Sequence, residues 1–576
     1  MKRNFLIASV VLLTSMALSA SAPADFELPD PHPASLEAWS QVTAPSIGWG
    51  STDHRYKLNE VPATSKTLNL YGWRGERVNA QAVVMAPKGG TISFSVSDLR
   101  CGKATIAASA INRYFVRYIM SDSFRNIHGK EDHGNHMTAS FDSVLVADRL
   151  SPQATLKAAP QTLRPLWIEI NIPADATPGK YRGTLTATVD GTEMTLPLSL
   201  TVGKRQLPKP ADWKFHLDLW QNPYAVARFF DVPLWSKEHF DLMRPLMEEL
   251  ANAGQKVITA SIIQHPWNSQ TEDPFESMIG KHKSIDGKWS YDYRVFDRWI
   301  EFMMSCGITK QIDCYTILPW HLTFEYFDEA RNCTIQKRLE PGSKEYEEYL
   351  LPMLTDFAAH LKSKGWFDIT CIAMDERPKN LLEPAYEIIY KSDKHWRIEG
   401  AINYYGPEVS ERMYDISFLY NQPLLEGEQL SNHLAKGNKI TFYTCCVPEF
   451  PNTFTFSAPS ESTFLGWHAA AAGYSGYLRW AYNSWVKNAW QDSRFRTWAA
   501  GDCAITYPGG SSIRFKRLVE GIQDYEKIAI LRGELKGKKL ERLESQLEKF
   551  TPTVIAEGFG FDQLVDESRT LLRSLE

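Results

Sequence analysis

Two neighbouring carboxylates follow a short apolar run in the second half of the chain. The run is Cys371–Met374, and Asp375 and Glu376 come directly after it. A run of this kind predicts a buried strand, and the catalytic groups of a (β/α)8 barrel lie just beyond the carboxyl ends of its strands. Burial and neighbouring charges can separate two pKa values there and so divide the roles of acid and base. The alternative role of the pair is to cap the next helix.

The ends of the other predicted strands carry mostly aromatic and hydrogen-bonding side chains. This combination suits sugars, whose C–H faces stack on rings while their hydroxyl groups need polar partners. From its position after a strand, Trp480 or Trp485 is expected to be a stacking platform. Hydrogen bonds to the substrate are expected from His265, Asn403, Tyr404 and Tyr420. For any one of these aromatic side chains, the alternative is a place in the core.

The adjacency of Asp375 and Glu376 restricts the reaction that they can perform. Ordinary glycosidases place two carboxylates on opposite sides of the scissile bond, about 5–5.5 Å apart for retention and about 6.5–9.5 Å apart for inversion. Neighbours at one strand end do not readily flank a sugar ring in this way. If both act, one protonates the leaving oxygen, and the other steers a nucleophile that the substrate supplies, such as a 2-acetamido carbonyl.

Both carboxylates can reach one ligand only if the strand changes course at this pair. Consecutive side chains of a regular strand point to opposite faces, so the strand must stop or twist there. Pro378 follows closely and prevents further regular pairing. Arg377, between the pair and this proline, is expected to form a structural ion pair near the carboxylates.

The elements that position this site follow from the pattern after residue 208. Short apolar runs alternate there with longer amphipathic segments, which indicates βα units and a parallel sheet. Eight runs fit a TIM-type barrel better than an open doubly wound sheet, and no Gly-rich phosphate loop follows the first. The runs are Phe215–Trp220, Lys256–Ile263, Gln311–Leu318, Ile369–Met374, Arg397–Asn403, Ile416–Tyr420, Lys439–Cys445 and Gly476–Trp480.

An antiparallel β-sandwich is predicted before the barrel. Between residues 67 and 202 short runs alternate with period two, and Asp190-Gly191 between two of them is a strong hairpin signal. Pro208 and Pro210 then interrupt the pattern. The predicted division is a signal peptide at 1–22, the β-sandwich at 23–207, the (β/α)8 catalytic barrel at 208–515, and C-terminal helices packed on the barrel at 516–576.

The first residues have the pattern of a secretory signal peptide. Lys2 and Arg3 precede the apolar run Phe5–Leu13, and small residues follow up to Ala22. No later run approaches the roughly 20 apolar residues of a membrane span, so we expect a periplasmic or secreted protein. The formal net charge of −5 argues against nucleic acid as a partner, because binding it requires a basic surface.

Other reactive side chains form no convincing site in the sequence. The eight cysteines lack CxxC or metal-ligand spacing, so buried free thiols are expected. Residues 128–136 hold three histidines and two acids that could bind a divalent ion or reach the barrel mouth, but their glycines favour a surface loop. The G-x-S-x-G elbow of many serine hydrolases is missing. We therefore expect neither a metal nor another cofactor.

Five motifs are spread over most of the chain that would follow signal cleavage. They are Ile172–Thr184, Met374–Glu376, Tyr507–Gly509, Ser512–Arg514 and Gly521–Glu526. Together they resemble glycoside hydrolase family 123, the β-N-acetylgalactosaminidases, and the Asp-Glu pair is the specific part of the likeness. The resemblance implies retention, no metal, and terminal β-linked GalNAc as substrate, such as that of glycosphingolipids. It also implies that Asp375 orients the acetamido group and stabilises an oxazolinium-like intermediate, and that Glu376 is general acid and then base.

Three functions remain open from the sequence. The leading one is an exported exo-β-N-acetylgalactosaminidase that acts on a glycan or glycolipid by substrate assistance. A β-hexosaminidase or another glycosidase of different sugar specificity fits the same carboxylates, because GalNAc and GlcNAc differ only in the configuration of one hydroxyl. A glycan-binding protein without activity fits the aromatic side chains alone.

Overall fold

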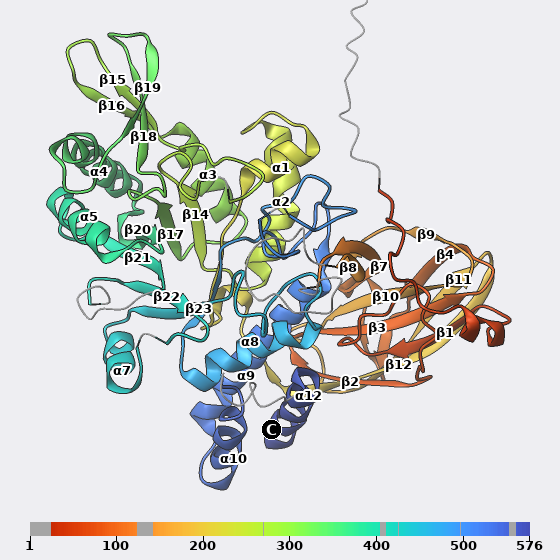
Figure 1. The fold of residues 1–576 in the computed structure, drawn as a ribbon. Coiled ribbons are helices and arrows are strands. Elements are labelled where there is room, and N and C mark those ends of the chain that lie inside the picture. Colours follow the sequence, from red (N-terminus) through yellow and green to blue (C-terminus); the bar gives the residue numbers. More distant parts are fainter. Residues whose placement is uncertain are drawn as a thin grey trace, which may run out of the picture.

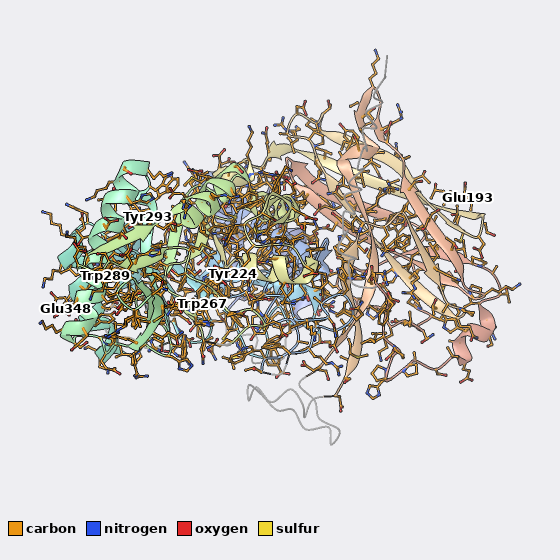
Figure 2. The ribbon with its side chains drawn as sticks, turned by 90° about the horizontal axis from the view of Figure 1, so that it is seen from above. Glu193, Tyr224, Trp267, Trp289, Tyr293 and Glu348 are labelled. Carbon is orange, nitrogen blue, oxygen red and sulfur yellow. The ribbon has the colours of Figure 1, made fainter. Side chains whose placement is uncertain are left out.

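The computed structural model describes residues 25–123, 142–268, 270–403, 411–423, 425–495, 497–551 and 560–576. The predicted signal peptide, the histidine-containing segment 128–136 and Tyr404 lie outside these residues. Figure 1 shows two lobes, a β-sandwich from the N-terminal part and a barrel from the remainder, with helices between them. Viewed from above, the lobes lie side by side, with Glu193 in the first and Trp267 in the second (Figure 2).

The N-terminal lobe consists of two packed β-sheets. One has the strand order β1-β3-β10-β7-β8-β25, in which β25 is Ser511–Ser512 from the other end of the chain, and the other has the order β2-β12-β11-β4-β9, with β5 and β6 at its edge. All pairs are antiparallel except β2 with β12, which is parallel. The predicted hairpin is confirmed, because Asp190 and Gly191 have φ of 45° and 83° and join two antiparallel strands. The strands are β1 Ser46–Gly50, β2 Leu68–Arg74, β3 Arg77–Ala86, β4 Gly90–Val96, β5 Leu99–Cys101, β6 Ala104–Ile106, β7 Ile111–Ser121, β8 Val144–Ser151, β9 Thr155–Ala158, β10 Thr162–Asn171, β11 Gly179–Val189 and β12 Thr192–Gln206.

The second lobe is built on eight parallel strands, one from each of the eight predicted runs. Their order is β13-β24-β23-β22-β21-β20-β17-β14. The barrel closes between β13 and β14, the two ends of this order. Leu217 and Gln255 form a parallel bridge there, and Lys256 N donates a 3.0 Å hydrogen bond to Leu217 O. The strands are β13 His216–Leu219, β14 Val257–Ser261, β17 Gln311–Tyr315, β20 Thr370–Asp375, β21 Arg397–Ile402, β22 Asp415–Leu419, β23 Lys439–Tyr443 and β24 Gly476–Arg479.

Helices cover the outside of the barrel. They are α1 Pro223–Phe230, α2 Lys237–Asn252, α3 Arg294–Ser305, α4 Lys344–Lys364, α5 Lys379–Ser392, α7 Gly427–Ala435 and α8 Pro459–Ala472. Local signals set their ends: the Ser343 side chain caps the first turn of α4, and Gly365, with φ of 72°, ends it. None of the described helices combines the length and apolar character needed to cross a membrane.

A small sheet that the sequence analysis did not anticipate stands on the barrel. Its order is β16-β15-β18-β19, and it lies beside α4 at one extremity of the molecule (Figure 1). Its strands are short and largely exposed or half-buried, so their apolar pattern is weak beside that of the buried barrel strands. They are β15 Gly280–Lys283, β16 Trp289–Asp292, β18 Thr323–Asp328 and β19 Cys333–Arg338.

The C-terminal helices join the two lobes. They are α9 Ile513–Glu534, α10 Lys538–Leu547 and α12 Phe561–Leu575. Helix α9 crosses α8 so closely that a Cβ on Gly466 would lie 2.1 Å from the Gly521 carbonyl oxygen. On its other side, Lys516 and Lys527 form buried ion pairs with Glu169 and Glu76 of the sandwich lobe, at 3.0 and 2.6 Å. This segment therefore packs on the sandwich as well as on the barrel.

Asp148 of β8 anchors the sandwich to the barrel. Its carboxylate accepts hydrogen bonds from Tyr507 Oη at 2.7 Å, Arg514 Nε at 2.8 Å and Arg55 Nη1 at 3.1 Å. Burial opposes its charge, but the two guanidinium groups hold the pKa of Asp148 below its usual range. Arg514 also donates to the Gly501 carbonyl. The motifs around Tyr507 and Arg514 thus fix a barrel loop that carries site residues.

Candidate active site

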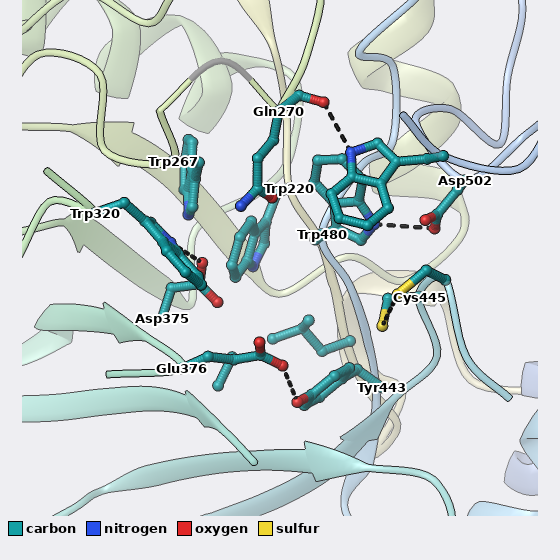
Figure 3. Close-up of a pocket in the computed structure, with 14 residues that line it drawn as sticks. Trp220, Trp267, Gln270, Trp320, Asp375, Glu376, Tyr443, Cys445, Trp480 and Asp502 are labelled. Atoms are coloured by element: carbon teal, nitrogen blue, oxygen red, sulfur yellow. Dashed lines mark hydrogen bonds between the residues drawn. The ribbon is translucent and has the colours of Figure 1, made fainter. Parts of the chain in front are cut away.

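A cavity of about 630 Å³ opens at the carboxyl ends of the barrel strands. Asp375 and Tyr443, which line it, are the last residues of β20 and β23. Figure 3 shows the two carboxylates on one side of the cavity and aromatic rings around it. The lining residues are Trp220, Trp267, Gln270, Trp320, Asp375, Glu376, Ala401, Tyr443, Cys445, Cys446, Leu478, Trp480, Trp498 and Asp502.

The backbone turns at the Asp-Glu pair, as the sequence predicted. Strand β20 ends at Asp375, and Glu376 has φ of 38°, in the left-handed region. The Glu376 N–H donates to the Ala401 carbonyl at 2.7 Å, which holds this turn against β21. Both side chains therefore line one cavity instead of facing opposite ways. Helix α5 has Pro378 at its N-cap, so neither carboxylate caps that helix.

Each carboxylate of the pair receives a hydrogen bond from an aromatic side chain. Trp320 Nε1 donates to Asp375 at 3.0 Å, and Tyr443 Oη donates to Glu376 at 2.5 Å. Burial, and next the charge of Glu376, raise the pKa of Asp375 to about 7, although the Trp320 bond and Arg377 oppose this shift. Burial also raises the pKa of Glu376, with Tyr443 opposing. The pair therefore retains a proton near neutral pH, as an acid catalyst requires.

Arg377 supports this arrangement through Trp320. Its guanidinium lies over the Trp320 ring, 5.3 Å from the centroid, and Nη2 donates to the Trp320 carbonyl at 3.5 Å. From the sequence, a structural ion pair was expected for Arg377. The structure instead shows a contact with the residue that holds Asp375.

Tryptophan side chains form the walls of the cavity. The Trp220 and Trp267 rings stack with centroids 5.0 Å apart. Trp480 Nε1 donates to Asp502 at 3.0 Å, and Asp502 is in turn paired with Arg479 at 2.9 Å. The indole N–H groups of four tryptophans have acceptors within 3.2 Å, namely Trp220, Trp320, Trp480 and Trp498. Because these rings are held in place, their faces are ready to stack on a sugar without loss of rotamer freedom.

Of the five predicted sugar contacts within the described part of the chain, only Trp480 lines the cavity. His265 is exposed and lines a separate depression with His321, and Asn403 is exposed outside the cavity. Tyr420 and Trp485 are 4% and 2% exposed and belong to the core. The remaining residue, Tyr404, lies outside the described part of the chain.

Side-chain direction explains why Tyr420 and Trp485 were wrongly predicted as sugar contacts. Leu419, at the end of β22, packs with the aromatic group around the cavity floor, so Tyr420 points to the outside and packs on His468 of α8. Trp485 lies further along its loop, where it packs on Phe229 and donates to the Thr506 carbonyl. Position after a strand does not determine which face a side chain takes.

Several lining residues were not selected from the sequence. Tyr443 is two residues beyond Thr441 on β23, and its inward direction follows from the period of two once the strand is known. Trp220, Trp267 and Trp320 each stand beside other polar or aromatic residues after a strand. No sequence signal shows that Trp320 rather than its neighbour His321 lines the cavity. Only the path of the loop decides this.

Below the cavity, three buried carboxyls form the one group of described residues suited to hold a metal ion. Asp218, Asp313 and Glu399 each offer an oxygen, and these oxygens all lie within 4.8 Å of one another. None of the three is among the residues that line the cavity, but Trp220, which does line it, donates its Nε1–H to Asp218 at 3.2 Å. Burial, followed by the charges of neighbouring acids that include Asp415, raises the pKa of each of these three acids well above its usual value.

Comparisons with known proteins agree with this architecture. A model of the glycoside hydrolase 123 catalytic domain matches residues 220–531, and one of the N-terminal domain of that family matches residues 49–189. A family 123 glycoside hydrolase from Clostridium perfringens, studied for glycolipid glycan hydrolysis, superposes with a TM-score of 0.82 at 25% identity, covering 92% of this chain and 99% of the other.

Some of the more distant solved structures are described as glycosidases, but they superpose poorly. A putative α-galactosidase/melibiase from Bacteroides fragilis has a TM-score of 0.25 at 12% identity, covering 79% of this chain and 77% of its own. A β-glucuronidase from Parabacteroides merdae has a TM-score of 0.30 at 8% identity, covering 78% and 50%. These scores are too low to carry an argument. No curated protein sequence matches the chain.

Proposed function

The chain belongs to glycoside hydrolase family 123, and we propose that it is a retaining exo-β-N-acetylgalactosaminidase that uses the acetamido group of its substrate as nucleophile. The observation that carries the proposal is the turn at Glu376, which brings two adjacent carboxylates into one cavity. Neighbouring residues cannot stand on opposite faces of a sugar ring, as the two carboxylates of an ordinary glycosidase do. A nucleophile from the substrate removes that requirement.

In the first step, the acetamido carbonyl oxygen attacks the anomeric carbon while Glu376 gives its proton to the leaving oxygen. Asp375 accepts a hydrogen bond from the acetamido N–H and stabilises the positive charge of the oxazolinium ring as it forms. The pair is coupled, so its raised pKa values belong to both carboxyls together. The acetamido N–H favours the ionised form of Asp375, which leaves the shared proton on Glu376.

In the second step, water attacks the anomeric carbon of the intermediate and opens the ring. Glu376, now a carboxylate, takes the proton from this water and is restored to its starting state. Each step inverts the anomeric centre, so the product keeps the β-configuration. Trp320 and Tyr443 support both steps because their hydrogen bonds orient the two carboxylates.

The cavity supports action on a terminal sugar. Tryptophan rings line it together with the two carboxylates, and a single sugar residue needs this combination of ring faces and polar groups. Since the Clostridium perfringens relative is described in connection with glycolipid glycans, we include glycolipids with terminal β-GalNAc among the proposed substrates. The pattern at residues 1–22 supports export to the periplasm or the exterior.

The test is hydrolysis of p-nitrophenyl β-GalNAc beside its GlcNAc epimer and its 2-hydroxy counterpart. Wild type is compared with Asp375→Asn and Glu376→Gln, with the exposed Glu348→Gln on α4 (Figure 2) as a matched carboxylate control. The proposal predicts turnover of GalNAc that both site variants lose and the control keeps. Turnover of the 2-hydroxy sugar would show that a protein carboxylate is the nucleophile.

Two other outcomes would favour the alternatives from the sequence. Faster turnover of the GlcNAc epimer would make the protein a β-hexosaminidase of different preference with the same mechanism. Saturable binding of GalNAc without any turnover would make it a glycan-binding protein. The observation that supports this alternative is that hydrogen bonds fix the tryptophan rings around the cavity.

A further inference from the structure

Two consecutive cysteines, Cys445 and Cys446, line the sugar cavity. Both are free thiols, and their Sγ atoms are 3.7 Å apart, which is van der Waals contact. Figure 3 shows the Cys445 sulfur across the cavity from Asp375 and Glu376. The mechanism above uses neither thiol.

The loop after β23 holds these two residues firmly in the wall. The Cys445 N–H donates to the Val447 carbonyl at 3.0 Å, and the Cys445 carbonyl accepts from Asn452 Nδ2 at 2.9 Å. Asn452 is itself fixed by the buried Arg479 at 2.9 Å. The loop therefore keeps the two sulfurs together at the cavity.

Nothing in the structure prepares the Cys445 thiol to attack the sugar as the nucleophile of hydrolysis. Its contact with Cys446, and then burial, raise its pKa well above the usual value, whereas reactive cysteines have a lowered pKa. A role in the shape of the cavity wall fits the arrangement better than a role in the reaction.

We propose that Cys445 and Cys446 form a reversible disulfide that is part of the wall of the sugar site. The oxidant is a disulfide-bearing thiol oxidoreductase of the exported compartment. One cysteine thiolate attacks its disulfide to give a mixed disulfide, and the second cysteine displaces the oxidoreductase. One S–S bond is formed and one is broken, two electrons pass to the oxidoreductase, and the two thiol protons are released to its thiols or to solvent. The pattern at residues 1–22 predicts a compartment where such bonds persist.

This bridge is expected to respond to the redox state of its surroundings. Consecutive Cα atoms are about 3.8 Å apart, below the usual range of about 4.4–6.8 Å for disulfides. Bridges with unfavourable geometry are more easily reduced than ordinary structural disulfides. Oxidation joins the two sulfurs into one rigid apolar surface, and reduction separates them.

The expected consequence is on substrate binding, and this part rests on the proposed function. Because the sulfurs lie across the cavity from the carboxylates, oxidation changes contacts with the sugar or its aglycone without touching the acid. Reduction should therefore raise KM for the β-GalNAc glycoside roughly two- to tenfold, as expected for loss of one sulfur contact, while kcat stays nearly constant.

The test begins with mass spectrometry of the cysteine peptide and not with a measurement of activity. Enzyme isolated from the exported fraction, or treated with oxidised glutathione, is alkylated under denaturing conditions and digested. The peptide with Cys445 and Cys446 should carry no alkyl group and lack the mass of two hydrogen atoms, and reduction before alkylation should abolish both signatures. Cys446→Ser should fix KM at the value of the reduced enzyme, whereas Cys101→Ser, a thiol of the sandwich, should keep the redox response.

Two results would overturn the proposal. One is complete alkylation of both cysteines in the exported and the oxidised enzyme. The other is a bridged peptide with the same KM before and after reduction. If the protein hydrolyses no GalNAc glycoside, the proposed function fails, but the mass of the peptide still decides whether the bridge exists.

Discussion

Two groups of buried acids lie in the same barrel, and they differ in their access to the cavity. Asp375 and Glu376 line the cavity, whereas Asp218, Asp313 and Glu399, the lower group, lie earlier along their strands and do not line it. In both groups the pKa values are raised, mainly by burial and often by neighbouring acids. A perturbed pKa therefore does not by itself identify a catalytic residue, and access to the substrate cavity separates the two groups.

The lower group is held by the barrel itself. Tyr315 Oη donates to Glu399 at 3.0 Å, and Gln311 donates to Asp313 at 3.0 Å. The neighbouring Asp415 pairs with His216 at 2.8 Å, and despite burial this histidine holds the pKa of Asp415 below its usual value. We infer that His216 stabilises the ionised form of Asp415, whereas burial favours the protonated forms of the three acids beside it.

The largest expected effect separates the two groups by activity. Asp375→Asn and Glu376→Gln should each lower kcat/KM for a β-GalNAc glycoside about 10²- to 10⁴-fold, the usual contribution of a general acid or base. Asp313→Asn should leave it within about threefold, because an amide resembles a protonated acid in shape. Steady-state kinetics of the three folded variants provide the measurement. A loss at Asp313 as large as that at Asp375 would break the distinction.

The pH dependence of the cavity pair gives a second, smaller effect. The pKa of Asp375 is raised to about 7, so the pair keeps a proton to near neutrality and kcat/KM should fall as pH rises above about 7. The Tyr443 bond opposes the rise in the Glu376 pKa. Tyr443→Phe should therefore move this alkaline limb to higher pH and lower kcat about tenfold. A pH–rate profile of both enzymes checks this, and an unmoved limb would remove Glu376 from the role of acid.

A substitution in the lower group should change the pH dependence of the free energy of unfolding instead of the activity. An acid whose pKa is raised on folding keeps its proton to a higher pH in the folded state than in the unfolded chain, so stability falls as pH rises through that interval. Asp313→Asn removes one such group. Its stability should therefore fall less between pH 5 and 8 than that of the wild type, by up to about 1.4 kcal/mol per pH unit.

Urea denaturation at several pH values provides this measurement. An identical pH dependence in the two proteins would show that Asp313 is ionised in the folded state. A loss of stability on treatment with EDTA, restored by a divalent ion and absent from the variant, would show that a cation rather than protons neutralises the group.

The smallest effect tests a residue that the sequence wrongly placed in the cavity. Tyr420 Oη is buried and has no hydrogen-bond partner among the described residues. Tyr420→Phe should leave kcat and KM unchanged and keep or raise the free energy of unfolding, by about 1 kcal/mol at most, because an unsatisfied hydroxyl is removed. Thermal denaturation and kinetics decide this. A raised KM would return Tyr420 to the sugar site.

Much of the fold could be predicted because its strands are local features. Each barrel strand is a short apolar run, and the Asp190-Gly191 turn requires the positive φ that its residues adopt. The small sheet β16-β15-β18-β19 was missed because its partly exposed strands lack a strong apolar pattern. The site was predicted in part: the carboxylate pair and Trp480 line the cavity, while Tyr420 and Trp485 do not.

The sequence by itself determined the positions of the strands and the adjacency of Asp375 and Glu376, because both depend on neighbouring residues along the chain. Only the tertiary structure decided which tryptophans surround the pair. Trp220, Trp320 and Trp498 come from separate loops, and their indole groups are held by Asp218, Asp375 and the Gln270 carbonyl. Such contacts depend on how the barrel closes and how its loops fold back over the strand ends, and no local pattern records either.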